Sequence, residues 1–232
     1  MGKTEQIDFL KSNISHFAKF IDHTNLKATA CTTEIEKLCK EALEYNFASV
    51  CVNPIHVALA SELLQNSQVK VCTVVGFPLG ATTHEGKAAE AALAVSQGAE
   101  EIDMVIDLGA IRDNRFGAVE EDISLVVKAS SLSKVKVILE VCYLSPKEIE
   151  LACLASMNAG ADFVKTSTGF ATSGATVESV ALMRKTVGPD FGVKAAGGIR
   201  SLNDAISMIE AGANRLGCSS SIQIIGELQG KK

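Results

Sequence analysis

The sequence predicts an α/β fold in which eight strand–helix units close into a parallel barrel. Eight short apolar segments have the length and composition of buried strands, and a helical pattern follows each of them. A glycine that ends a helix, followed by a small residue and a strand, recurs at Gly98, Gly160 and Gly212. Units of about 25 to 30 residues in a chain of 232 residues fit a closed barrel better than an open sheet.

The expected strands and helix starts alternate along the chain. A capping box at Thr33-x-x-Glu36 predicts a helix that runs to Tyr45. Further helices are expected to start at Asn53-Pro54, Ser145-Pro146 and Ser201, where a capping side chain precedes the first turn. The expected strands are Phe20–Thr24, Ala48–Val52, Val69–Val75, Glu101–Ile106, Val135–Val141, Ala161–Val164 followed by Lys165, Phe191–Ala195 and Arg215–Gly217.

An additional helix is expected before the first strand. Thr4–Phe20 carries apolar residues at helical spacing, so residues 1–19 are expected to form a helical extension of a single domain that spans residues 1–232. The alternative fold is an open, doubly wound sheet, but the first strand–helix turns contain no G-x-G-x-x-G fingerprint. The expected fold class is therefore an α/β, (β/α)8 TIM barrel with an extra N-terminal helix.

Composition excludes several classes of function. Hydrophobic residues make up 47% of the chain and the net charge is −5, so no basic field for nucleic acid is expected. No long apolar run suits a membrane span, and Met1–Leu10 lacks the apolar core of a signal peptide, which predicts a cytoplasmic protein without membrane contact. The seven cysteines form no C-x-x-C pair and the four histidines form no ligand pattern, so no metal site is expected.

Lys165 interrupts a segment that otherwise has the composition of a buried strand. Alternation places Phe163 and Lys165 on one face and Val164 on the other, so Lys165 points into the barrel if Val164 packs against helices. A lysine in a poorly hydrated space favours its neutral form, which is a nucleophile toward a carbonyl carbon. The alternative is a lysine that extends from the strand end to water.

The same alternation turns Asp103 and Lys194 toward the barrel interior, opposite Ile102 and Met104 in one strand. The alternatives are a strand-end cap for Asp103 and a solvated cation at the barrel rim for Lys194. Beside Lys165, however, a second ammonium favours the neutral amine and a carboxylate can pass protons. Two lysines and one carboxylate in one enclosed space are typical of Schiff-base chemistry.

Glycine-containing loops follow the last two expected strands. Gly197-Gly198 comes after the seventh strand, and Gly217, Ser219 and Ser220 come at the end of the eighth. Glycines let backbone N–H groups approach an anion, and the helix N-termini that follow add positive potential. One glycine pair is more often only a turn. Two such loops on adjacent strands, where barrels commonly bind phosphate, predict a phosphate group on the substrate.

Five motifs resemble those of the deoxyribose-phosphate aldolase family, in register from about Ile21 to Ser220. The lysine motif is the most specific of them. The motifs are Phe163-Val164-Lys165-Thr166-Ser167-Thr168-Gly169, Val193-Lys194-Ala195-Ala196-Gly197-Gly198-Ile199-Arg200, Glu101-Ile102-Asp103-Met104-Val105, Val75-Gly76-Phe77-Pro78-Leu79-Gly80 and Cys51-Val52-Asn53-Pro54.

The resemblance implies an aldolase that reversibly cleaves 2-deoxy-D-ribose 5-phosphate to D-glyceraldehyde 3-phosphate and acetaldehyde, in deoxyribonucleotide catabolism, without metal or organic cofactor. Lys165 would form the Schiff base, Lys194 would tune it and Asp103 would relay protons. The expected partner is a small phosphosugar, and the chain is expected to be a homo-oligomer such as a dimer, or a monomer. The implied phosphate-binding residues are Gly169, Gly197, Gly198, Gly217, Ser219 and Ser220.

Two departures and two competing functions accompany the resemblance. Some relatives carry a lysine where this chain has Phe170, and some carry a tyrosine in a C-terminal tail where this sequence ends Gln229-Gly230-Lys231-Lys232. One competing function is a Schiff-base aldolase or transaldolase for a larger phosphosugar. The other is a barrel that binds a phosphosugar without turning it over.

Overall fold

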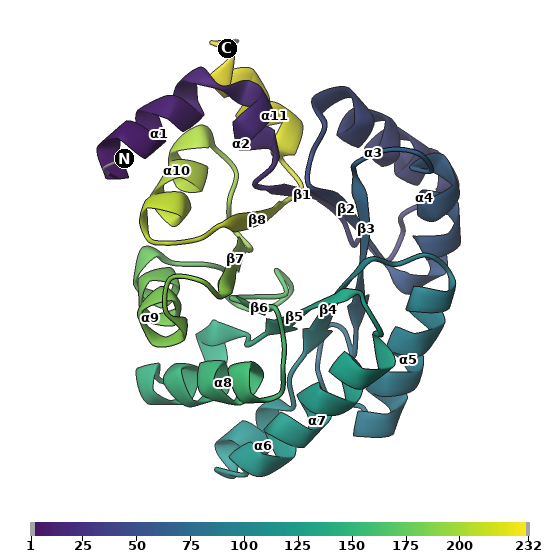
Figure 1. Ribbon diagram of the computed structural model, residues 1–232, viewed down its shortest axis with the longest axis vertical. Coiled ribbons are helices and arrows are strands. Elements are labelled where there is room, and N and C mark those ends of the chain that lie inside the picture. The colour runs from purple at the N-terminus through teal and green to yellow at the C-terminus, as the bar shows by residue number, and fades with distance from the viewer. Residues whose placement is uncertain (1–2, 231–232) are drawn as a thin grey trace.

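The computed structural model describes residues 3–230, and a closed barrel of parallel strands surrounded by helices forms its core (Figure 1). The strands lie in chain order, and β8 pairs with β1 to close the barrel. This arrangement confirms the predicted (β/α)8 TIM barrel. The strands are β1 Ile21–Asn25, β2 Ser49–Val52, β3 Lys70–Val75, β4 Glu101–Val105, β5 Lys134–Ile138, β6 Phe163–Lys165, β7 Gly192–Ala196 and β8 Arg215–Cys218.

The helices form the outer ring, and among the described residues none is long and apolar enough to cross a membrane. They are α1 Lys3–Ser12, α2 Ile14–Ala18, α3 Thr32–Tyr45, α4 Val57–Leu63, α5 His84–Ser96, α6 Leu108–Arg112, α7 Phe116–Ala129, α8 Pro146–Asn158, α9 Val177–Val187, α10 Leu202–Glu210 and α11 Ser221–Leu228, with short 3-10 turns η1 Pro54–His56 and η2 Val141–Tyr143.

The N-terminal segment differs from the single helix predicted over Thr4–Phe20. It forms two helices, because Asn13 leaves the helical conformation and its side chain accepts a hydrogen bond from the His16 N–H at the start of α2. The helical segment lies against the last helices of the barrel, α1 beside α10 and α2 beside α11 (Figure 1). Leu10 and Phe17 are fully buried there, which anchors the segment. Residues 1, 2, 231 and 232 lie outside the described residues.

The capping box predicted at Thr33 and Glu36 is wrong by two residues. Helix α3 starts at Thr32, and the N–H of Cys31 before it donates to the Glu34 carboxylate over 3.0 Å. The sequence pattern therefore has the right spacing, but the first turn uses the earlier glutamate. A cysteine is a weak capping residue, which is why the pattern favoured Thr33.

Strand β5 ends before the predicted boundary at Val141. The peptide N–H of Leu139 still donates to the Lys165 carbonyl over 2.9 Å, but Glu140 adopts a left-handed conformation with φ of 54°. Residues other than glycine rarely adopt this conformation, and the sequence around Glu140 is apolar. The sequence therefore contained no signal that the strand ends before Glu140. The turn aims the Glu140 carboxylate at the loop after β6, where it accepts hydrogen bonds from Thr168.

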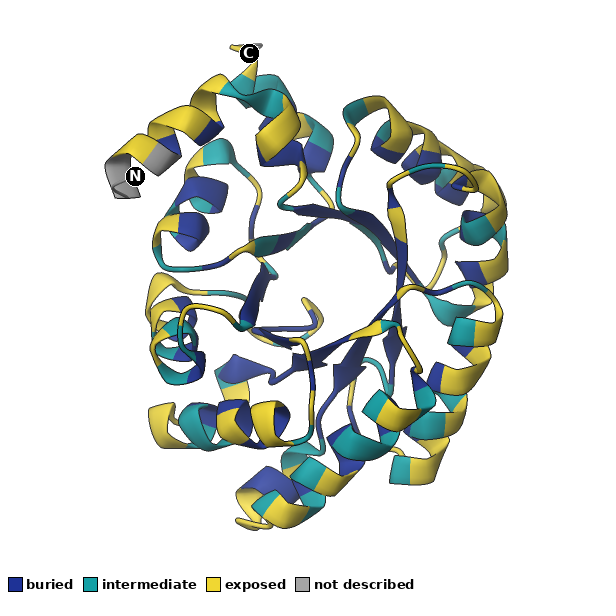
Figure 2. Ribbon diagram, viewed as in Figure 1, coloured by how far each residue is buried: buried dark blue, intermediate teal, exposed yellow. Residues whose placement is uncertain are grey.

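The strands are almost entirely buried, and the helices bury the faces that they turn toward the barrel (Figure 2). On β4, Ile102 and Met104 pack in the main apolar core, while Asp103 contacts Lys165 in the barrel interior. The predicted alternation of this strand is thus present. A second, smaller apolar cluster consists of Leu26, Cys51, Cys72 and Val74, with Phe77 packed against it.

A buried ion pair joins α5 to α7. Lys87 Nζ lies 2.6 Å from Asp122 Oδ2, and both side chains are fully buried. Burial raises the pKa of Asp122, while the nearby Lys87 ammonium opposes that shift. The other oxygen, Asp122 Oδ1, has no hydrogen-bond partner among the described residues. Lys87 is therefore the main compensation for this buried carboxylate.

Removing one partner of this pair should cost more than removing both. We expect Lys87→Met to lower the free energy of unfolding by about 3–5 kcal/mol, because Asp122 keeps an uncompensated buried charge. The double variant Lys87→Met/Asp122→Leu should regain much of that loss, since neither charge remains. Urea denaturation measures the free energy of unfolding of both variants. Lys147→Met, in the exposed pair with Glu150, is the control and should change stability by less than about 0.5 kcal/mol. A double variant less stable than Lys87→Met would contradict this account.

Candidate active site

Asp103 of β4 is the centre of a buried group of charges inside the barrel. Its Oδ2 accepts hydrogen bonds from Lys165 Nζ of β6 at 2.8 Å and from Lys194 Nζ of β7 at 2.7 Å. Its Oδ1 accepts from Lys136 Nζ of β5 at 2.8 Å. The structure thus brings together the three residues that the sequence placed in the barrel, and it adds a third lysine to them.

The contacts continue beyond Asp103 and close into a ring. Lys194 Nζ also pairs with Asp22 of β1, and Asp22 Oδ1 lies 2.7 Å from Arg215 Nη1 of β8. Arg215 contacts Glu101 of β4 at 3.0 Å, and Lys136 lies 2.6 Å from the same carboxylate. We call these six residues the charge ring: Asp103, Lys194, Asp22, Arg215, Glu101 and Lys136. Acid and base alternate around it, and Lys165 attaches to it through Asp103 alone among the contacts of the described residues.

The charge ring is almost completely shielded from water. Lys194 is 1% exposed, Lys165 is 3% exposed, and Asp22 and Asp103 are fully buried. Burial tends to raise the pKa of Asp103, but the ammonium groups of Lys136, Lys165 and Lys194 outweigh it and hold that pKa well below its usual value.

The pKa values of Asp22, Lys194 and Lys136 are also shifted toward their charged forms. Burial tends to raise the pKa of Asp22, but Arg215 and Lys194 lower it below its usual value. Burial tends to lower the pKa of Lys194, but Asp103 and Asp22 raise it above the usual lysine value. The pKa of Lys136 is raised well above the usual value for the same reason, burial being outweighed first by Asp103.

Counting charges singles out Lys165. The charge ring contains three carboxylates and three cations, so it is neutral when every member is ionised. Lys165 in its ammonium form adds a fourth cation to a space that excludes water. A buried charge without compensation is costly. The charges of the ring therefore balance without Lys165.

A cavity of about 520 Å³ opens above Lys165 at the carboxyl ends of the strands. Lys165 is among its lining residues, whereas Asp103 and Lys194 lie below it. The structure brings five of the six predicted phosphate residues to the wall of this cavity: Gly169, Gly197, Gly198, Gly217 and Ser219. Ser220 is not in the lining; it occupies the N-cap position of α11.

The glycine loops need glycine for two physical reasons. Gly197 and Gly198 have φ of 85° and 82°, a left-handed conformation that side chains strain. A Cβ on Gly174 would lie 2.1 Å from the Gly197 carbonyl oxygen, so two backbone segments touch there. Thr166 fixes the neighbouring strands, because its hydroxyl donates to the Ala196 carbonyl and accepts from the Ala196 N–H, both over 3.0 Å.

Phe170, the first departure noted in the sequence, lies on the wall of the cavity. Its ring meets Phe77 edge-on, with centroids 5.2 Å apart, and it forms part of the cavity wall. That side of the cavity is therefore apolar. Cationic side chains line the cavity elsewhere, at Lys27, Lys37 and Arg200.

Sequence reasoning missed four members of the charge ring. Lys136 lies between Val135 and Val137, so the alternation that identified Lys194 also turns it inward. Asp22, Glu101 and Arg215 lie near the amino ends of their strands, where a charge is unremarkable in a sequence. Closure between β1 and β8 brings Arg215 and Asp22 together across 193 residues, which no local pattern indicates.

The family model described as "DeoC/LacD family aldolase" matches residues 16–231 of this sequence. The chain belongs to this aldolase family. A "Deoxyribose-phosphate aldolase" of Streptococcus gordonii is 60% identical over 207 residues, which cover 89% of this chain and 94% of the relative. The protein of the same name from Clostridium perfringens is 59% identical over 208 residues, covering 89% of this chain and 93% of the relative.

A solved structure of the same type has the same fold. The deoxyribose phosphate aldolase of Aeropyrum pernix, described as tetrameric, superimposes with a TM-score of 0.89 at 35% sequence identity. The match covers 97% of this chain and 97% of that chain. The aldolase family and the barrel architecture therefore agree over nearly the whole chain.

The buried carboxylates of this aldolase should make its stability sensitive to acid. The folded pKa of Asp22 lies below the unfolded value of about 3.9, so the ionised form stabilises the fold above that pH, and the contribution is lost as pH falls toward the folded value. In Asp22→Asn this contribution is absent. The free energy of unfolding, measured by urea denaturation, should therefore fall less steeply below about pH 4 than in the parent.

The substitution should also lower stability near neutral pH by about 3–5 kcal/mol, because Lys194 and Arg215 lose a buried partner. The exposed Asp8→Asn is the matched control and should keep the parent's acid dependence. An unchanged slope in Asp22→Asn would show that Asp22 is not ionised in the folded protein.

Proposed function

We propose that the chain is a deoxyribose-phosphate aldolase that cleaves 2-deoxy-D-ribose 5-phosphate reversibly through a Schiff base on Lys165. The observation that carries this proposal is the position of Lys165: it lies between an open cavity and a buried charge ring that is neutral without it. The family supports the same activity, since relatives with this name are about 60% identical.

Lys165 is the proposed nucleophile. Its neutral amine attacks the aldehyde carbon C1 of the open-chain sugar, and loss of water gives an iminium ion. When the bond between C2 and C3 breaks, the C3 hydroxyl gives up its proton and becomes the aldehyde of free glyceraldehyde 3-phosphate. The electron pair of the broken bond moves toward the iminium nitrogen and gives an enamine, and the proton that was released balances the one taken up at C2 in the next step. Protonation at C2 and hydrolysis then release acetaldehyde and restore Lys165.

Asp103 and Lys194 are proposed to manage the protons of these steps. Asp103 Oδ2 contacts both lysines, so a proton can pass between them through one oxygen atom. The low pKa of Asp103, set by its ammonium neighbours against burial, keeps it a carboxylate. The proton donor at rest is then the Lys194 ammonium. Its charge also favours the neutral form of Lys165.

The phosphate is proposed to bind at the part of the cavity wall that the loops after β7 and β8 form. Gly197, Gly198 and Gly217 leave their peptide N–H groups uncovered by side chains, and Gly169 and Ser219 lie on the same wall. Ser220 at the N-cap of α11 is proposed to act with the positive end of that helix. Phe170 supplies no charge for the phosphate. Backbone groups of the loops are therefore proposed to carry more of the phosphate recognition than they would if position 170 were a lysine.

Borohydride reduction in the presence of acetaldehyde tests the covalent step. We expect a stable two-carbon adduct on Lys165, identified by peptide mass spectrometry, because reduction traps the imine. Lys165→Ala should lose both the adduct and measurable turnover. Release of acetaldehyde from 2-deoxyribose 5-phosphate also separates this activity from that of a transaldolase.

An adduct found on Lys194 instead of Lys165 would overturn the assignment of the nucleophile. Full activity in Lys165→Ala would overturn the Schiff-base mechanism. Circular dichroism of the variant distinguishes lost chemistry from lost folding.

Two glycines offer a matched test of the phosphate site. Gly198 and Gly188 have φ of 82° and 78°, and a Cβ at either position would meet no atom within 4 Å. Alanine at either should lower stability, because side chains rarely adopt a positive φ. Only Gly198 lines the cavity. We expect Gly198→Ala to raise KM for the phosphosugar about tenfold, equivalent to about 1.4 kcal/mol, with a smaller effect on KM for unphosphorylated 2-deoxyribose.

Gly188→Ala at the end of α9 is the control, because Gly188 also has a positive φ but does not line the cavity. It should leave KM for the phosphosugar at the parent value. Equal kcat/KM of the parent for the sugar with and without phosphate would show that no phosphate site exists, since remote binding energy normally enters kcat/KM.

A further inference from the structure

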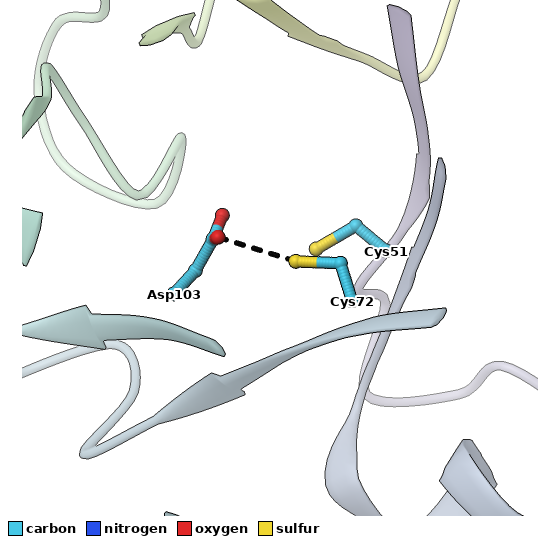
Figure 3. Close-up of side chains that lie close together, drawn as sticks. All are labelled: Cys51, Cys72 and Asp103. Carbon is cyan, nitrogen blue, oxygen red and sulfur yellow. Dashed lines mark hydrogen bonds between the residues drawn. The ribbon is translucent and has the colours of Figure 1, made fainter. Parts of the chain in front are cut away.

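Two cysteines lie beside Asp103 inside the barrel. Cys51 of β2 and Cys72 of β3 point toward the carboxylate from adjacent strands (Figure 3). Cys72 Sγ donates to Asp103 Oδ1 over 3.2 Å, and Lys136 Nζ lies 3.3 Å from the same sulfur. Both cysteines are fully buried. The proposed aldolase chemistry uses neither thiol.

The geometry of the two strands allows a bond between these sulfur atoms. Cys51 and Cys72 are directly paired in the β2–β3 register. Adjacent strands lie about 4.8 Å apart, which is inside the range of about 4.4–6.8 Å between the Cα atoms of a disulfide. The two sulfurs and an oxygen of Asp103 also lie within 4.8 Å of one another. A disulfide therefore needs rotation of the two side chains and little movement of the backbone.

The surroundings of the pair favour a reactive thiolate. The neighbouring Cys72 thiol, and then the charges of Lys194 and Lys165, lower the pKa of Cys51, although burial opposes the shift. Burial, and then the neighbouring Cys51, raise the pKa of Cys72 well above its usual value. The thiolate form is therefore more favoured at Cys51 than at Cys72. By contrast, burial raises the pKa of Cys153 and Cys218 to about 12.

We propose that Cys51 and Cys72 are a reversible oxidation site, at which a small peroxide forms a disulfide that switches the enzyme off. The Cys51 thiolate attacks one oxygen of hydrogen peroxide; an S–O bond forms, the O–O bond breaks, and hydroxide leaves and takes up the proton that the thiol had released. Cys51 is now a sulfenic acid, and one peroxide has been reduced to one water.

Cys72 completes the reaction as the resolving cysteine. Its sulfur attacks Cys51 Sγ, the S–S bond forms, the S–O bond breaks, and the leaving hydroxide takes the proton of the Cys72 thiol as a second water. In total, two thiols and one peroxide give one disulfide and two waters. A dithiol reductant such as dithiothreitol reverses the reaction.

Formation of this disulfide acts on the charges next to it. Cys72 can no longer donate to Asp103 Oδ1, and its sulfur, which accepts from Lys136 Nζ, is drawn toward Cys51. Both changes fall beside the carboxylate that accepts hydrogen bonds from Lys165 and Lys194. The disulfide therefore alters the group that is proposed to move protons during turnover.

Peroxide reaches the pair through the mouth of the barrel. Leu26 belongs both to the wall of the cavity and to the apolar cluster that contains Cys51, Cys72 and Val74. Leu26 therefore links the cavity wall to the cluster that holds the thiols. Because a bound phosphosugar fills the cavity, substrate should slow oxidation of the pair.

A variant without the two more accessible thiols, Cys31→Ser/Cys142→Ser, is the background for the test. The purified protein is treated with hydrogen peroxide in the presence of EDTA, free thiols are alkylated, and peptides are mapped without reduction. We expect a Cys51–Cys72 linked peptide to appear in step with loss of aldolase activity. Dithiothreitol should remove the linked peptide and restore most of the activity.

Substitutions of the two cysteines distinguish the attacking role of Cys51 from the resolving role of Cys72. In the same background, Cys51→Ser should resist peroxide, because the attacking thiolate is gone. Cys72→Ala should still be oxidised at Cys51 but should not recover with dithiothreitol, because a sulfenic acid without a resolving thiol proceeds to the sulfinic acid. Cys153→Ser, another buried cysteine, is the control and should behave like the background protein.

The proposal is overturned if the inactivated protein contains both cysteines reduced, or if Cys51→Ser loses activity as fast as the background protein. It is also overturned if the linked peptide forms while activity is unchanged. The peptide map does not depend on turnover. It therefore shows whether the Cys51–Cys72 disulfide forms even if the protein lacks the proposed aldolase activity. Circular dichroism before and after oxidation separates a local change from unfolding.

Discussion

The carboxylate of Asp103, which accepts hydrogen bonds from three lysines at once, is the interaction on which the rest of the site depends. Ammonium groups and carboxylates are stable in a space without water only when each is compensated. The charge ring supplies this compensation, because every carboxylate in it lies between two cations. Lys165 adds a cation beyond this balance.

The same ring constrains the barrel. Its members come from β1, β4, β5, β7 and β8, so five strands must meet in one register for the contacts to form. A shift of one residue in any of them turns its charge toward the helices and an apolar residue toward Asp103. The apolar outer core is rich in valine and isoleucine, which can replace one another, so it specifies the register less sharply. The polar interior of the barrel therefore selects the register.

The site separates its tasks along the barrel axis. The charge ring lies deepest, Lys165 lies above it, and the glycine loops line the cavity at the mouth. The thiol pair of Cys51 and Cys72 touches the deepest layer from the side of β2 and β3. Changes at the mouth are thus expected to act on the proposed phosphate binding, and changes at the thiols on the proposed proton transfer around Asp103.

The sequence by itself determined the eight strand–helix units, the alternation that turns Asp103, Lys165 and Lys194 inward, and the glycines of the mouth. These features follow from local periodicity, which a linear chain displays directly. Local rules erred at Thr33, at Asn13 and at Glu140, where one side chain or one left-handed residue ended an element. Only the tertiary structure decided that Lys136, Asp22, Glu101 and Arg215 complete a ring around Asp103. Such contacts join residues up to 193 positions apart, and they exist because closure of the barrel brings the first and last strands together.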